Sequence, residues 1–369
     1  MDNRIRELDG IRGIAILLVM CTHLLKRANY LTGNAALIAF GEIFRIGWVG
    51  VDLFFVLSGY LITSILLKTR QQEHYYKNFY ARRILRIFPL YYVTLLITFP
   101  LLVWLDKNLG PETRANWPIF LVYLQNWLYV FGREPSNVVG VTWSLAIEEQ
   151  FYLLWPFIVK KLERRQLVQF IFGFLLFILA ARIGLIFVAR QAINLEDLYY
   201  YASFIRFDGL LMGALLALAL TSDFWREWVR RRAGWFFWAS LAALTLMLVS
   251  GPPSANFANL PLMTAGYSLL AVFFAACLAL ALTGEKNNPL RWLFANRGLI
   301  FFGKYSYALY LFHLPVGVFL LNFFWASGRK NAAVWLTYTA LAFGITILLA
   351  LLSWNLLEKR VLRLKRYFE

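Results

Sequence analysis

Long apolar stretches dominate this chain, and short polar or basic segments separate them. A stretch of about 20 apolar residues is long enough to cross a bilayer as a helix. We predict about ten such helices, at residues 12–30, 48–67, 87–105, 142–159, 168–190, 203–220, 234–250, 262–282, 299–322 and 333–355. The apolar segment 120–131 is too short to span, and we expect an interfacial or re-entrant piece there. The pattern therefore predicts an all-α fold, a polytopic transmembrane helical bundle.

The composition agrees with a membrane protein. Hydrophobic residues make up 60% of the chain and charged residues only 15%, whereas soluble domains are about 25% charged. No polar linker interrupts the apolar stretches, so we expect residues 1–369 to form a single domain, with no appended extracytoplasmic domain. Cys21 and Cys277 both lie in apolar stretches, and no metal-ligand spacing is present, so we expect neither a disulfide nor a metal site.

The positions of the basic residues predict the topology. The net charge is +17, which in a soluble protein would indicate nucleic-acid binding. Here the cations collect in alternate loops and at both ends, at residues 4–6, 68–86, 160–165, 226–232, 286–297 and 359–366. By the positive-inside rule these segments and both termini face the cytoplasm, so we expect a multi-pass protein of the cytoplasmic (inner) membrane without a nucleic-acid partner. Lys26 and Arg27 are exceptions, because they fall on the outer side and must snorkel to that interface.

Ionisable residues inside the predicted helices are candidates for function. His23 follows Arg12 by eleven residues, which returns to the same helical face about 16 Å further along. An intramembrane imidazole is functional by default, although a buried histidine bonded to a neighbouring helix fits the pattern equally. The predicted topology places seven such residues in the outer half: His23, Asp52, Glu148, Glu149, Arg206, Asp208 and His313. We predict that they line a single polar cavity, although ordinary charges at helix ends would explain Asp52, Arg206 and Asp208.

A second layer of charge lies at the predicted cytoplasmic face. Arg12 begins the first helix, and Arg83 and Arg86 are spaced to share one face of a later helix. Positive-inside anchoring explains such residues, but arginine is also the preferred bidentate partner of phosphates. Together the two layers predict a phosphate-bearing donor at the inner surface and chemistry nearer the outer one. Coenzyme A, with a phosphorylated head and a thin arm ending in a thioester, fits this arrangement.

Six segments carry a resemblance to a known family. They are LDGIRGIA at 8–15 followed by His23, GVDLFFVLSGY at 50–60, FYARRILRIFP at 79–89, WSLAIEEQFY at 143–152, RFDG at 206–209 and YSYALYLFH at 305–313. In this order and over residues 8–358, the chain resembles the acyltransferase 3 family of integral-membrane acyltransferases. The resemblance implies about ten helices, a cytosolic acyl-CoA donor (commonly acetyl-CoA) and an acceptor hydroxyl, usually on a cell-envelope glycan.

The resemblance also implies that Arg12, His23, Arg83, Arg86 and Glu148 matter for activity. Longer family members carry an additional extracytoplasmic hydrolase-like domain, so a separate soluble partner could complete the transfer, or none could be needed. The number of subunits is left open.

These observations lead to a hypothesis of O-acyl transfer. His23 would act as general base, because an imidazole titrates near neutral pH, and Glu148 would orient it as the carboxylate does in a catalytic triad. Asp52 is a weaker candidate for that role, and His313 fits a second base or a helix–helix hydrogen bond. An acyl-enzyme on His23, Ser58 or Ser144 is an alternative to direct transfer.

A transporter offers a different reading of the same residues. Intramembrane histidines and carboxylates also relay protons, so a proton-coupled transporter or flippase of a polar or glycan solute is the alternative function.

Overall fold

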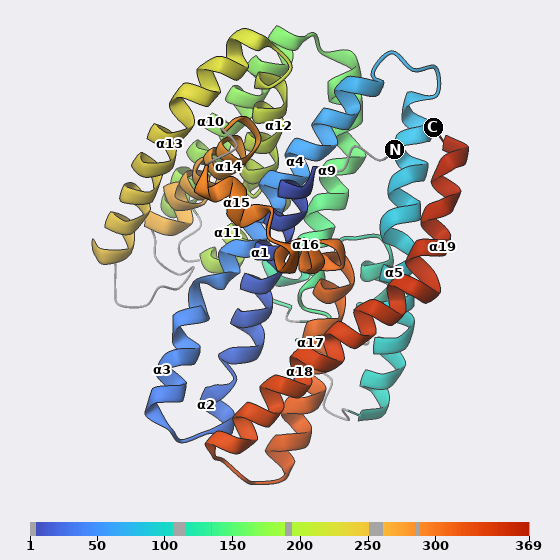
Figure 1. Cartoon of the computed structure of the whole chain (residues 1–369), viewed down its shortest axis with the longest axis vertical. Helices are drawn as coiled ribbons and strands as arrows, with labels where there is room; N and C mark the ends of the chain where they lie inside the picture. The colour runs from blue at the N-terminus through green and yellow to red at the C-terminus, as the bar shows by residue number, and fades with distance from the viewer. Residues whose placement is uncertain are drawn as a thin grey trace.

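The computed structural model describes residues 5–105, 115–133, 135–188, 194–250, 261–284 and 288–368, which are helical and contain no strand (Figure 1). The longer helices are α1 (Arg6–Leu25), α3 (Ala35–Ile43), α4 (Val49–Thr69), α5 (Tyr75–Leu105), α9 (Thr142–Lys161), α10 (Arg164–Val188), α12 (Asp208–Ala219), α13 (Asp223–Ser250), α14 (Tyr267–Thr283), α16 (Arg297–Lys304), α17 (Ser306–Ala326) and α18 (Ala332–Ser353). The shorter ones are α2 (Ala28–Leu31), α7 (Trp117–Leu121), α8 (Asn126–Val130), α11 (Leu195–Tyr201), α15 (Pro289–Phe294) and α19 (Lys359–Leu362). The prediction of an all-α helical bundle is confirmed.

Eight helices of the described chain are long and apolar enough to cross a membrane, and each corresponds to one of the ten predicted spans. The last two residues of the predicted span 168–190 lie outside the described residues. The other two predicted spans are less typical. Helix α9 carries Glu148, Glu149 and Gln150 at its middle, and α12 has only 12 residues. Both nevertheless pack against α4 inside the bundle, so their polarity and shortness are accommodated by protein rather than by lipid.

The predicted helix 299–322 is wrong in one respect, because it is two helices. Tyr305 leaves the helical conformation and separates α16 from α17. Helix α16 packs on α1, and a Cβ added to Gly303 would lie 1.7 Å from the carbonyl oxygen of Asp9. A straight helix along α17 could not also make this close crossing.

Glycines in the sequence motifs permit these close helix crossings. A Cβ on Gly13 of α1 would lie 2.0 Å from the carbonyl oxygen of Leu299 in α16. A Cβ on Gly59 of α4 would lie 1.9 Å from the carbonyl oxygen of Leu210 in α12. Small residues allow backbones to approach when helices associate in membranes. The glycines therefore allow α1 to pack closely on α16 and α4 to pack closely on α12. Helix α1 carries His23 and helix α4 carries Ser58.

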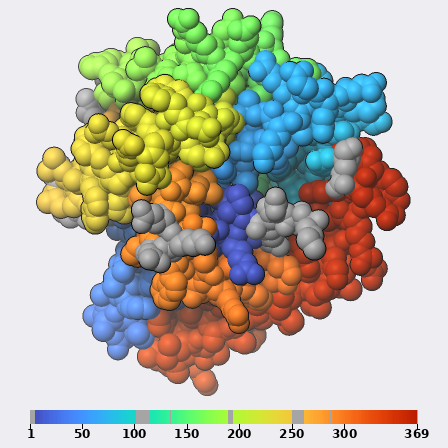
Figure 2. Space-filling model, turned by 45° about the horizontal axis from the view of Figure 1, so that its top comes forward, coloured from blue at the N-terminus to red at the C-terminus, as the bar shows by residue number. Residues whose placement is uncertain are grey.

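The basic segments gather at one face of the bundle, as the charge pattern predicts. Contacts between distant segments at this face are Arg70 Nη2 to the carbonyl of Leu162 (2.8 Å), Arg82 Nε to that of Phe368 (2.7 Å), Arg164 Nη2 to that of Leu218 (3.3 Å) and Arg291 Nε to Glu7 Oε1 (2.8 Å). Figure 2 shows the dark-blue start of the chain and its red end on the same face. Both ends of the described chain therefore lie on one side; Arg4 and Lys286 of the predicted basic segments lie outside the described residues.

The segment 120–131 does not span, in agreement with the prediction. Helices α7 and α8 have five residues each, and Tyr123 between them has a φ of 55°. The turn is held by side chains of the long helices, because Gln150 Nε2 donates to the carbonyl of Tyr123 (2.7 Å) and the Tyr91 hydroxyl donates to that of Phe120 (2.8 Å). Since Gln150 lies midway along α9, the segment enters the bundle and its backbone is satisfied by protein.

Candidate active site

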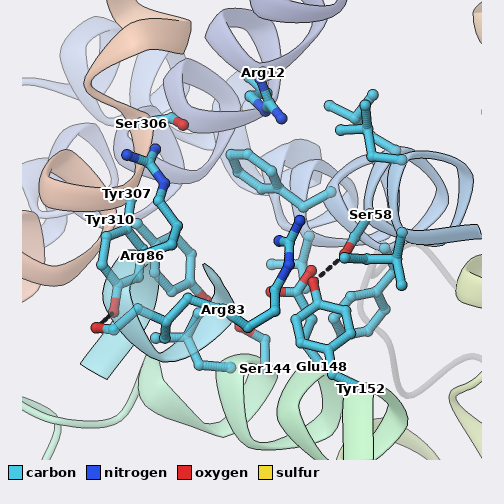
Figure 3. Close-up of a pocket in the computed structure, with 18 of the residues that line it drawn as sticks. Arg12, Ser58, Arg83, Arg86, Ser144, Glu148, Tyr152, Ser306, Tyr307 and Tyr310 are labelled. Carbon is cyan, nitrogen blue, oxygen red and sulfur yellow. Dashed lines mark hydrogen bonds between the residues drawn. The ribbon is translucent and has the colours of Figure 1, made fainter. Parts of the chain in front are cut away.

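A narrow inner cavity of about 200 Å³ opens between α1, α4, α5, α9 and α17 (Figure 3). Its polar lining consists of Arg12, Ser58, Arg83, Arg86, Ser144, Glu148, Tyr152, Ser306, Tyr307 and Tyr310. Five helices that are far apart in the sequence thus supply hydroxyl, carboxylate and guanidinium groups to one space.

Three arginines from α1 and α5 line this cavity, as the sequence predicts for its inner layer. Arg12 Nη1 lies 2.8 Å from Asp9 Oδ1, and Arg86 Nη1 lies 3.7 Å from Glu358 Oε2. The guanidinium of Arg83 lies over the Tyr152 ring, 5.6 Å from its centroid. Each arginine is therefore held by a partner, and together they make one wall of the cavity cationic.

Glu148 lies in the inner cavity rather than beside His23. The groups that act on its carboxylate are the hydroxyls of Ser58 and Tyr152 and the guanidinium of Arg83, and the two hydroxyls bond to each other (Figure 3). The sequence hypothesis that Glu148 orients the His23 imidazole is therefore not matched by this geometry, which pairs Glu148 with the cationic wall instead.

A second, outer cavity of about 380 Å³ contains His23. Its polar and aromatic lining consists of Thr22, His23, Lys26, Arg27, Asn29, Tyr30, Arg45, Trp48, Tyr129, Asn137, Trp143, Tyr200, Tyr201 and Tyr310. Of the residues that the structure describes, Val51 and Tyr310 alone line both cavities. The two spaces therefore meet at one short wall within the bundle.

Tyr310 forms the polar part of this wall. Its hydroxyl lies 2.6 Å from Ser144 Oγ and donates to the carbonyl of Val141 at 2.9 Å. Its ring centroid lies 5.7 Å from that of His313, one turn further along α17. The wall is thus built from α9 and α17, directly beside the histidine pair.

His23 and His313 form a hydrogen-bonded pair across α1 and α17. His313 Nδ1 lies 2.7 Å from the carbonyl oxygen of Tyr310 and 3.1 Å from that of Leu309. A carbonyl only accepts, so Nδ1 of His313 carries the proton and Nε2 of the neutral ring is an acceptor. This Nε2 lies 3.1 Å from His23 Nδ1, which must therefore donate. The lone pair of His23 is left on Nε2.

The prediction of a single polar cavity is wrong. Glu148 lines the inner cavity and His23 lines the outer one, whereas His313 lines neither and bonds to His23. Asp52, Arg206 and Asp208 belong to two buried ion pairs. Asp52 Oδ1 lies 2.9 Å from Arg206 Nη2, and Asp208 Oδ2 lies 2.9 Å from Arg182 Nη2. The sequence predicted a common depth for these charges but could not show that they would form ion pairs with opposite charges on neighbouring helices.

Arg206 is completely buried and sits over the Tyr267 ring, 4.0 Å from its centroid. Neither Asp52, Arg206 nor Asp208 lines either cavity. Their geometry is that of a structural link between α4, α10 and α12.

A family model described as an acyltransferase domain matches residues 5–354. The chain belongs to this acyltransferase family. The resemblance seen in the sequence motifs is confirmed, and the match covers every residue of the two cavities.

Curated relatives of this acyltransferase chain include an O-acetyltransferase OatA of Staphylococcus aureus, 29% identical over 95% of this chain and 56% of the relative. Another is a putative peptidoglycan O-acetyltransferase YrhL of Bacillus subtilis, 30% identical over 96% of this chain and 54% of the relative. The chain thus spans about half the length of the relatives it matches. No solved structure matches it.

Sequence reasoning missed three residues of this acyltransferase chain. Tyr310 and Tyr152 stand in the matched motifs but look like ordinary membrane aromatics, and only the fold shows that they line the inner cavity. Arg182 was detectable, because an arginine inside the apolar stretch 168–190 requires a partner. That partner is Asp208.

Proposed function

We propose that this protein is a membrane O-acyltransferase that moves an acyl group, most simply acetyl, from cytosolic acyl-CoA to a hydroxyl of a cell-envelope glycan. The proposal rests on one observation within a member of the acyltransferase family: an arginine-lined cavity and a histidine-bearing cavity meet at Tyr310. The names of the relatives add O-acetyl transfer as the expected chemistry.

The donor would enter from the basic face of the bundle. Arg12, Arg83 and Arg86 would bind the phosphates, since guanidinium groups bind them bidentately. The inner cavity is narrow, at about 200 Å³, so it suits the thin arm of coenzyme A, with the nucleotide head remaining at the mouth. The arm would present its thioester to the wall at Tyr310.

The acceptor hydroxyl would approach from the outer cavity. His23 Nε2 would remove the hydroxyl proton, and the oxygen would attack the thioester carbonyl once Tyr310 leaves the wall. The carbon–oxygen bond forms, the carbon–sulfur bond breaks, and the imidazolium returns its proton to the departing thiolate. The hydrogen bond to His313 would hold a proton on His23 Nδ1, so that Nε2 is the nitrogen that takes up and returns the transferred proton.

Glu148 would serve the donor side in this scheme. Its carboxylate lies among Ser58, Tyr152 and Arg83, so it would hold Arg83 and shape the passage for the arm. Asp52 would have a structural role, because its carboxylate already forms an ion pair with Arg206.

The first test is mass spectrometry of envelope glycans and lipids from cells with the protein, without it, and with His23→Ala at matched membrane levels. A hydroxyl-linked acyl increment that needs both the protein and His23 supports the proposal. Loss of a general base costs about 100- to 10,000-fold in rate, so the variant should show no increment. An increment that persists with His23→Ala would overturn the base assignment, and a solute gradient without any increment would favour transport.

A further inference from the structure

The outer cavity is lined by cations that have no role in the proposed reaction. Lys26, Arg27 and Arg45 all line it together with His23. Lys26 and Arg27 stand at the non-cytoplasmic end of α1, where the positive-inside rule disfavours them. Snorkelling would direct them toward the interface and the lipid headgroups, but the structure places them in the lining of the outer cavity.

The structure shows contacts for two of these three cations. Arg45 Nη1 lies 3.6 Å from Glu42 Oε2, and Arg27 lies over the Tyr30 ring at 6.0 Å. The ammonium group of Lys26 makes no hydrogen bond or ion pair within the described ranges. Among the described residues that line the cavity, three are lysine or arginine and none is a carboxylate, so this lining is positively charged.

Aromatic rings form much of the remaining surface. Trp48, Trp143, Tyr129, Tyr200 and Tyr201 line the same cavity. Such rings offer flat apolar faces for the C–H faces of a sugar, while their polar edges can hydrogen-bond to its hydroxyls.

One of these rings has an unused donor. The indole Nε1 of Trp48 is buried and has no acceptor among the residues that the structure describes. Buried donors in folded proteins nearly always find a partner. An acceptor oxygen on a ligand in the cavity would satisfy it.

We infer that the outer cavity binds an anionic saccharide, one that carries a carboxylate or a phosphate, with its anion on Lys26, Arg27 and Arg45 and its sugar ring on the tryptophans and tyrosines. This inference rests on the proposed function for the identity of the reaction. The binding of an acidic sugar can be tested separately from the transfer of an acyl group. The anion would fix the orientation of the saccharide, so that one particular hydroxyl reaches His23 Nε2.

The volume of the cavity agrees with this class of ligand. At about 380 Å³ it lies near the lower end of the ~300–1,000 Å³ typical of small-molecule sites. One or two sugar units would fill it, and a longer glycan would extend outward from it.

The test uses three oligosaccharides of equal length: maltotetraose, its 6-phosphorylated form and its uronic acid form. Binding to the purified protein in detergent is followed by tryptophan fluorescence, since Trp48 and Trp143 line the cavity, and transfer is followed separately with labelled acetyl-CoA. We expect the acidic forms to bind at least about 10-fold more tightly than maltotetraose, because hydrogen bonds to charged groups typically contribute a 10- to 100-fold effect. The preference should weaken as salt is raised.

The variants Lys26→Gln and Arg27→Gln should remove most of the preference, so that the acidic forms bind no more tightly than maltotetraose. Arg329→Gln is the matched control, because Arg329 is an exposed cation in the loop between α17 and α18 and does not line the cavity. Whichever acidic form binds better identifies carboxylate or phosphate as the natural anion.

Equal binding of all three sugars, or no binding of any, would overturn the inference, and transfer to a neutral sugar would then leave the proposed function in place. Preferential binding of an acidic form without transfer to any sugar would support the inference and count against the proposed function.

Discussion

His23 Nδ1 and His313 Nε2 lie 3.1 Å apart, which joins α1 to α17 through two imidazole rings. The backbone carbonyls of Leu309 and Tyr310 hold the proton on the far nitrogen of His313. The proton positions of both rings follow from this chain, because each nitrogen in turn has only one available role. A base whose lone pair must face the acceptor benefits from such a fixed tautomer.

Replacing His313 should therefore impair turnover without affecting the donor site. We expect His313→Leu to lower kcat by about 10- to 100-fold, within the 10,000-fold that loss of the correct tautomer costs in a serine protease triad. His313→Gln should recover part of the loss, because an amide oxygen can accept from His23 Nδ1. The KM for acyl-CoA should not change in either variant, and the pH dependence of kcat should shift. Steady-state kinetics over a range of pH values provide the measurement.

Tyr75→Phe is a control for the loss of any buried interhelical hydrogen bond. The Tyr75 hydroxyl donates to the carbonyl of Pro156 at 3.0 Å and lines neither cavity. If His313→Leu and Tyr75→Phe reduced kcat equally, or if Gln restored nothing, His313 would be part of the packing and not a positioning residue.

The cationic wall of the inner cavity makes a separate prediction about the donor. Arg83→Ala should weaken binding of acyl-CoA by about 10- to 100-fold, as expected for loss of a hydrogen bond to a charged group. Arg82→Ala is the matched control, because Arg82 is adjacent in sequence but donates to the carbonyl of Phe368 outside the cavity. Calorimetric titration with desulfo-CoA separates binding from turnover. Equal affinities for the two variants would remove Arg83 from the phosphate site.

The sequence predicted the helices and the inner layer of arginines because both depend on local patterns. Apolar runs of membrane length and loop charge are properties of neighbouring residues. Arg83 and Arg86 share a face by helical spacing alone. For the same reason the sequence placed His23 and His313 at a common depth, where the structure joins them.

Pairing between distant helices was beyond the same reasoning. That Arg206 would meet Asp52, and that Glu148 would face Arg83 instead of His23, depends on which helices are neighbours and how they are rotated. The break at Tyr305 was hidden as well, because the apolar pattern continues through it and only the crossing of α16 over α1 requires it.

The Asp52–Arg206 pair should act on stability and not on chemistry. Removing one partner of a buried ion pair costs about 3–5 kcal/mol, whereas replacing both by apolar residues of similar volume is often neutral. We expect Asp52→Leu and Arg206→Met each to lower the melting temperature sharply in detergent, and the double variant to recover much of it. Acyl transfer per folded molecule should be retained in the double variant. A folded double variant that is inactive would instead show that the pair, and not its contribution to stability alone, is needed for acyl transfer.

The close crossing of α1 and α16 predicts that replacing glycine by alanine lowers the melting temperature at the crossing but does not lower it at an open position. In Gly13→Ala the new Cβ would lie 2.0 Å from the backbone oxygen of Leu299, so the helices must separate. Overpacking of this kind costs about 1–3 kcal/mol, more than the ~1 kcal/mol that alanine gains over glycine in a helix. In Gly173→Ala, on α10, the new Cβ would meet nothing within 4 Å. Only the stabilisation from the higher helix propensity of alanine then remains. Thermal unfolding in one detergent should therefore show a lower melting temperature for Gly13→Ala and an unchanged or higher one for Gly173→Ala.

Because α1 carries both Arg12 and His23, the shift of α1 should also reduce acyl transfer by Gly13→Ala at temperatures where the variant is still folded. Equal melting temperatures for the two variants would contradict the crossing.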